Sequence, residues 1–168
     1  MKTQNRAAVS NFQVLSNSSI SHLEQACKAS VHVYSRLSME FPHSQYNRIL
    51  ELQAKDHILF ILKTLKSIEK IYSGKYEKVD CDQRKLQIFL LDVHRQIFEL
   101  ERCENIVPTK VLKKILKNME IHFRGLISHL KITDFSAEGW GETAGVVLQH
   151  LRRLDLLATK TKIELHDH

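Results

Sequence analysis

The sequence predicts an all-α protein, a bundle of long helices. Glycine and proline are scarce, with 5 Gly and 2 Pro among 168 residues, whereas folds rich in strands use both in many tight turns. Apolar residues recur at the spacing of one helix face in five segments. Several of these segments reach roughly 22 to 28 residues, above the usual globular helix length of about 11 to 12. Long amphipathic helices with short connections are typical of a helix bundle.

The first two predicted helices are separated by a proline. One is expected over residues 18–39, where the hydroxyl of Ser18 or Ser19 can cap the first turn. It ends before Pro42, because a proline disfavours helical backbone at the residue that precedes it. The second is expected over residues 48–72 and carries a strong apolar stripe.

Three more helices follow. They are expected over residues 81–104, over residues 108–131 and from Ser136 past Leu157. Asp80 or Asp82 stands at the start of the first of these, and Thr109 at the start of the next. Gly139, Gly141 and Gly145 each weaken the last helix by about 1 kcal/mol relative to Ala. Tertiary packing must therefore hold the beginning of that helix.

The length of the chain predicts one domain. We expect a flexible N-terminal segment over residues 1–15, the helical domain over residues 16–163 and a tail over residues 164–168. The first residues lack the apolar stretch of a signal peptide, so either the leader has been removed or the protein is made in the cytosol. The longest apolar run, Ile58–Leu62, is far too short to span a membrane, and we expect no membrane insertion.

The three cysteines are an odd number, which leaves at least one thiol unpaired or in an intermolecular bridge. Cys81 and Cys103 lie at the two ends of one predicted helix, about 33 Å apart at 1.5 Å per residue. A disulfide needs Cα atoms within about 7 Å, so these two cannot pair in a straight helix. Cys27 sits on an apolar helical stripe, which favours a place in the core over a nucleophile.

Nothing in the sequence assembles an active site. The one Glu-x-x-His pair, Glu40 and His43, spans Pro42 and cannot build a metal site of the kind found in helix bundles. The histidines His122 and His129 share a face of the fourth helix, and His150 is expected near them, but the favoured interpretation is that these are ordinary partly buried or surface histidines. Neither a nucleophile elbow nor a phosphate-binding glycine loop is present. We therefore expect no enzyme activity, no metal and no cofactor.

The formal net charge is +6, with basic and acidic residues mixed along most segments. No nucleic-acid-binding motif accompanies this charge, so we expect no nucleic-acid partner. Basic residues share one side of the fourth helix and flank the stripe of the last one: Lys110, Lys113, Lys114, Lys117, Arg152 and Arg153. They are either a solvated face or a surface that steers an acidic partner. Asn17 begins an Asn-Ser-Ser glycosylation sequon.

One stretch resembles a known family. Residues 134–140 read Asp-Phe-Ser-Ala-Glu-Gly-Trp, and residues 148–155 form a basic amphipathic segment. An aromatic-Ser dipeptide, three residues, a tryptophan and then such a helix is similar to the last-helix signature of type I interferons. Phe41-Pro42 ahead of Tyr46-Asn47 resembles the fish members. The likeness covers roughly residues 15 to 160 in the order and spacing of the elements.

The resemblance implies the class II helical cytokine fold, in which four helices run up-up-down-down and a fifth packs alongside. It implies that the connection over residues 36–48 is long and crosses the bundle, and that Trp140 anchors the last helix in the core. Cys103 matches a family cysteine whose usual partner lies near the N-terminus. Here that place reads Arg6-Ala7-Ala8, so this disulfide is expected to be missing.

The same resemblance implies a secreted, monomeric antiviral cytokine that binds two class II cytokine receptor chains and triggers JAK-STAT signalling. A tighter receptor site is implied at Arg36, Arg48, Ala144, Leu148, Gln149, Arg152 and Arg153. A weaker site is nominated across the second, third and fourth helices at Lys66, Lys70, Arg95, Lys113 and Lys117. The alternatives are a cytoplasmic helical adaptor, which the odd cysteine count favours, and a helical metalloprotein.

Overall fold

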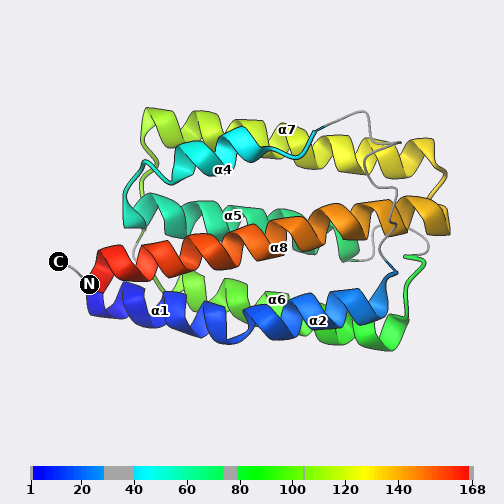
Figure 1. Ribbon diagram of the computed structural model, residues 1–168, viewed down its shortest axis with the longest axis horizontal. Helices are drawn as coiled ribbons and strands as arrows, with labels where there is room; N and C mark the ends of the chain where they lie inside the picture. The colour runs from blue at the N-terminus through cyan, green and yellow to red at the C-terminus, as the bar shows by residue number, and fades with distance from the viewer. Residues whose placement is uncertain (1, 29–39, 74–78, 104, 167–168) are drawn as a thin grey trace.

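The computed structural model describes residues 2–28, 40–73, 79–103 and 105–166. All regular structure in these ranges is helical, as the sequence predicts (Figure 1). No helix in the described ranges is both long enough and apolar enough to cross a bilayer.

The helices form one elongated bundle. Their bounds are Lys2–Val14 for α1, Ser16–Ala26 for α2, His43–Ile49 for α4, Ala54–Tyr72 for α5, Gln83–Glu101 for α6, Lys110–Ile132 for α7 and Ala137–His166 for α8. Helices α1 and α2 follow one another as one bent rod that runs in the same direction as α5, while α6 and α8 run in the opposite direction (Figure 1). Helix α7 lies along α5 and α8 as the fifth long element. The predicted up-up-down-down arrangement is confirmed.

The N-terminal segment, for which the sequence suggested a flexible chain, is mostly helical. Residues 2–14 form α1, which packs against α6 and α8. Its side chains Ala8, Val9 and Phe12 are buried in those contacts. Because the chain is already helical ahead of residue 16, Ser18 and Ser19 lie inside α2 and do not cap its first turn. The last helix likewise continues to His166, through most of the expected tail.

The expected helix over residues 48–72 is divided in two. Helix α4 ends at Ile49, and α5 begins after Gln53. Gln53 and Asp56 form a capping box, in which the Gln53 backbone N–H donates to the Asp56 carboxylate over 3.1 Å. This reciprocal pair satisfies the free N–H groups of a new helix, so it sets the start of α5.

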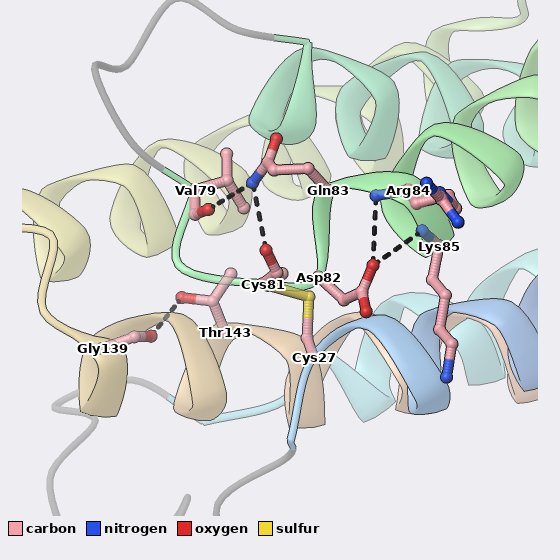
Figure 2. Close-up of a disulfide and its surroundings, with 9 residues drawn as sticks. All are labelled: Cys27, Val79, Cys81, Asp82, Gln83, Arg84, Lys85, Gly139 and Thr143. Atoms are coloured by element: carbon pink, nitrogen blue, oxygen red, sulfur yellow. Dashed lines mark hydrogen bonds between the residues drawn. A yellow bond between two sulfur atoms is a disulfide. The ribbon is translucent and has the colours of Figure 1, made fainter.

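Three of the expected helix starts are capped as the sequence predicts. Asp82 accepts hydrogen bonds of 3.1 Å from the backbone N–H groups of Arg84 and Lys85 (Figure 2). The Thr109 hydroxyl accepts from the N–H of Leu112, and the Ser136 hydroxyl from the N–H of Gly139. Each cap satisfies backbone donors that the first helical turn leaves free.

Tertiary packing holds the glycine-rich start of α8. Trp140 is fully buried, and α8 packs against α1, α2, α5 and α7. Gly139 faces the end of α7 so closely that a Cβ there would collide with the Thr133 side chain. The weak helix propensity of this glycine is thus offset by the close approach that it permits.

A disulfide joins Cys27, at the end of α2, to Cys81, just ahead of α6 (Figure 2). The sequence left this pairing open. The two Cα atoms lie 4.7 Å apart, within the range for a disulfide. Beside it, the backbone N–H of Asp82 donates to the carbonyl of Ala26 over 2.8 Å. Cys103 is half-buried and is not in a disulfide.

Replacing both Cys27 and Cys81 with Ser should lower the free energy of unfolding by about 2 to 4 kcal/mol, because the disulfide restricts the unfolded chain. Denaturant unfolding under non-reducing conditions measures the change. Cys103→Ser serves as the control and should shift the free energy by about 1 kcal/mol or less. Equal losses in the two variants would contradict this prediction.

Candidate partner-binding surfaces

Beyond its first turn, helix α8 exposes few side chains to solvent: Lys160, His166 and those of a narrow strip along one face. The strip consists of Gln149, Arg152, Leu156, Thr159 and Ile163, which recur every three or four residues and so share one helix face. Leu156 is 66% exposed and Ile163 is 56% exposed, so the strip combines a charge with apolar side chains. We refer to these five residues as the α8 strip.

The expected apolar contact residues of α8 do not lie on this strip. Ala144 is fully buried and Leu148 is only 4% exposed. Both side chains are packed inside the bundle, so in this structure neither one presents a surface to a partner. The leucine that α8 presents to solvent is Leu156, which sequence reasoning missed. Its spacing of four residues from Arg152 was the available signal.

Arg152 is available to a partner. It is exposed and forms an ion pair with Glu24 of α2, with 3.4 Å between Nη2 and Oε2. Both side chains are about half exposed, and such a surface pair contributes little to stability. A partner carboxylate could therefore replace Glu24 at small cost.

Arg153, in contrast, joins α8 to α4. Its guanidinium lies 4.7 Å from the ring centroid of Tyr46 and 5.9 Å from that of Phe41. Its Nη1 donates to Nδ1 of His43 over 2.9 Å. These cation–π and hydrogen-bond contacts attach the segment around α4 to the last helix. Replacing Arg153 would therefore disturb the fold as well as any interface.

A buried chain of polar groups lies beneath this contact. The Tyr46 hydroxyl is 2.6 Å from Nδ1 of His150, and Nε2 of His150 is 2.8 Å from Nε2 of His122. Burial, the adjacent His122 and the charge of Arg153 lower the pKa of His150 well below its usual value. Burial lowers the pKa of His122 to about 4. Both rings are therefore neutral at physiological pH, and one proton lies between the two Nε2 atoms.

The three histidines that the sequence placed near one another separate into two contacts. His122 meets His150, whereas Nε2 of His129 lies 3.3 Å from a carboxylate oxygen of buried Glu142. In the part of the chain that the structure describes, no three potential metal ligands gather around one point.

The other residues of the predicted tighter site are dispersed. Arg48 lies half-buried on α4, and Gln149 lies half-buried on the α8 strip. Arg36 is outside the described residues. The glycosylation candidate Asn17 is exposed on α2, while the hydroxyl of Ser19 in the same sequon is buried and donates to the carbonyl of Ser16. Glycosylation at Asn17 stays a prediction.

The predicted weaker site divides between two places. Lys66 and Lys70 from α5 and Lys113 and Lys117 from α7 line one groove between those helices. Arg95 lies on α6 and is not part of the groove lining. The five residues therefore do not form the single surface that the sequence suggested.

Helix α6 carries an exposed stripe that sequence reasoning also missed. Its members alternate at intervals of four and three residues: Arg84, Ile88, Leu91, Arg95, Phe98 and Arg102. Leu91 is 68% exposed and Phe98 is 59% exposed. Intervals of three and four residues are typical of a helix face that packs against another helix. Sequence reasoning identified only the inward-facing stripe of the same helix. We call these six residues the α6 stripe.

The α6 stripe and the α8 strip lie on different sides of the bundle. Helices α6 and α8 share α1, α2 and α5 as packing neighbours, and they sit diagonally to one another (Figure 1). A partner on one of these helices therefore leaves the other one accessible.

The folded protein should lose stability as the pH falls below the ordinary histidine pKa. His122 has a pKa near 6.5 when unfolded and about 4 when folded, so the unfolded chain binds more protons between these values. The contribution of His122 to the free energy of unfolding is complete above about pH 6.5, and about 2 kcal/mol of that contribution is lost by about pH 5. Denaturant unfolding at a series of pH values measures this loss.

A matched pair of variants tests the assignment. His122→Gln should make the pH dependence shallower, and Asn118→Gln, at a half-buried residue of the same helix that does not ionise, should leave it unchanged. The same pH dependence in His122→Gln as in the unmodified protein would contradict the prediction.

The chain resembles known proteins in sequence and in fold. A family model described as the interferon alpha/beta domain matches residues 1–158. Interferon a3 of Oncorhynchus mykiss is 29% identical over 122 residues, which cover 71% of this chain and 66% of that protein, just under two thirds of its length. The solved structure of zebrafish interferon 1 superposes with a TM-score of 0.80 at 24% identity, covering 92% of this chain and 99% of the zebrafish chain, so the two share a fold. Because the family model spans nearly the whole sequence, this chain belongs to the interferon alpha/beta family.

Proposed function

We propose that this chain is a secreted interferon cytokine that binds two class II cytokine receptor chains and thereby starts antiviral signalling of the JAK-STAT type. Membership of the interferon alpha/beta family supports this function. The structural observation that carries it is the pair of exposed surfaces on diagonal helices, the α8 strip and the α6 stripe. Two receptor chains held on one small protein have a high effective concentration relative to one another, which promotes contact between their intracellular parts.

The first receptor chain binds the α8 strip together with the neighbouring part of α4. Leu156 supplies an exposed apolar anchor, and Arg152, Gln149 and Arg48 supply a polar rim around it. An apolar centre with a charged margin is the usual anatomy of a protein interface. Arg36, which the family resemblance implies for the same site, belongs to this proposal as well.

The second receptor chain binds the α6 stripe, with Arg95 near its middle. Arginine and aromatic residues are enriched at the centres of interfaces, whereas lysine is depleted there. The stripe has that composition, with two large apolar side chains, Leu91 and Phe98, on either side of Arg95. The lysine groove between α5 and α7 does not have it, so we assign the second receptor contact to α6.

Changes on the α8 strip should weaken capture by the first receptor chain. Arg152→Glu and Leu156→Ser should each weaken the affinity about tenfold, because one reverses a charge at the rim and the other removes the apolar anchor. Surface binding to soluble ectodomains of the receptor chains measures the effect. Ile132→Ser, which alters an 82% exposed residue at the end of α7, is the control and should change nothing. Unchanged affinity in both α8 variants would remove the strip from the receptor site.

Changes on the α6 stripe should separate binding from signalling. The double variant Leu91→Ser and Phe98→Ser should keep its affinity for the first chain and lose at least about tenfold of its potency in a reporter assay on receptor-bearing cells. It should also compete with the unmodified protein, since it occupies one chain without recruiting the other. Full potency in this variant, with the Ile132→Ser control equally active, would show that α6 does not contact a receptor.

A further inference from the structure

A basic groove of about 800 Å³ runs between α5 and α7. Its cationic side chains come from both walls: Lys63, Lys66 and Lys70 from α5, and Lys113, Lys117 and Arg124 from α7. Among the described residues that line it, Glu120 is the one acidic side chain. The groove therefore concentrates positive charge well beyond the moderate net charge of the chain.

Most of this charge is not neutralised within the protein. Lys66 contacts Glu101 over 3.3 Å, and it is the one cation of the groove that forms an ion pair with another described residue. Three successive pairs of these cations lie three or four residues apart on one helix: Lys63 and Lys66, Lys66 and Lys70, and Lys113 and Lys117. Like charges at this spacing destabilise a helix. The arrangement costs stability, and an anionic ligand would offset that cost.

We propose that this groove binds a linear sulfated polysaccharide. Such a chain carries anionic groups at short intervals and can lie between two rows of cations. At 1.5 Å per residue, the row from Lys63 to Lys70 spans about 10 Å, and the row from Lys113 to Arg124 spans about 16 Å. The two walls lie side by side, because α5 packs against α7. Both helices run in the same direction (Figure 1). Sulfate groups along one chain can therefore contact both rows.

The shape and chemistry of the groove favour a polysaccharide over other polyanions. Proteins that bind single-stranded nucleic acid stack its bases on aromatic side chains, and no aromatic residue is among the described residues that line this groove. A flat bilayer surface fits poorly into a recess between two helices. The flexible lysine ammonium groups, in turn, suit the point-like charges of sulfates.

This binding would leave the two proposed receptor surfaces open. None of the residues that line the groove belongs to the α8 strip or to the α6 stripe. A polysaccharide on a cell surface could thus hold the protein close to its receptors without covering the contacts. The groove inference does not depend on that signalling role, because binding is measured with the purified protein alone.

The test uses surface binding to an immobilised heparin oligosaccharide of defined length at near-physiological salt. The triple variant Lys70→Gln, Lys113→Gln and Lys117→Gln should bind about tenfold or more weakly, since it loses three cation–anion contacts. The matched control is Lys55→Gln, Lys85→Gln and Lys131→Gln, which removes the same charge from exposed lysines outside the groove. It should bind within about twofold of the unmodified protein. Circular dichroism and thermal unfolding establish that both variants fold.

Four results would overturn the proposal. The first is that the unmodified protein does not measurably bind heparin. The second is an equal loss of heparin affinity in the groove variant and in the control variant, which would indicate unspecific attraction to net charge. The third is tighter binding to single-stranded RNA or to vesicles containing phosphatidylserine than to heparin. Desulfated heparin should bind much more weakly than heparin itself, and equal binding would also contradict the inference.

Discussion

The burial of α8 is the constraint on which the rest of this fold depends. The helix packs against α1, α2, α5 and α7, and most of its side chains between Gly139 and Ala158 are buried. A helix that is apolar around most of its circumference needs neighbours on nearly every side. These four helices enclose it, and α1 is joined to it by Gln13, which donates to the Asp155 carboxylate and to the Thr159 hydroxyl.

This enclosure limits where a partner can bind. A partner on the side of α8 meets a narrow strip that borders α2 at Arg152 and α1 at Thr159. Helix α6 lies at the edge of the bundle and exposes a broad face, while α5 and α7 leave a groove between them. The three surfaces differ in chemistry: a mixed polar and apolar strip, an arginine-rich apolar stripe and a lysine groove. That difference is the reason for assigning them to different partners.

Much of the fold could be predicted from the sequence because it depends on residues that are close together in the chain. Helix content, helix order and the helix starts at Asp82, Thr109 and Ser136 follow from apolar spacing and from side chains that bond to backbone within three residues. The family resemblance added the direction of each helix and pointed to the last helix as a contact element. Sequence alone also determined that Cys81 and Cys103 cannot pair.

Only the tertiary structure decided which side chains meet across the bundle. The apolar pattern of α8 is so wide that it does not show which leucine faces outward, and packing turned Leu148 inward and left Leu156 in solvent. The disulfide between Cys27 and Cys81 and the contact of Tyr46 with His150 join residues distant in the chain. The helix over residues 2–14 owes its order to α6 and α8. Periodicity and caps are local properties, whereas burial and pairing depend on which helices come together.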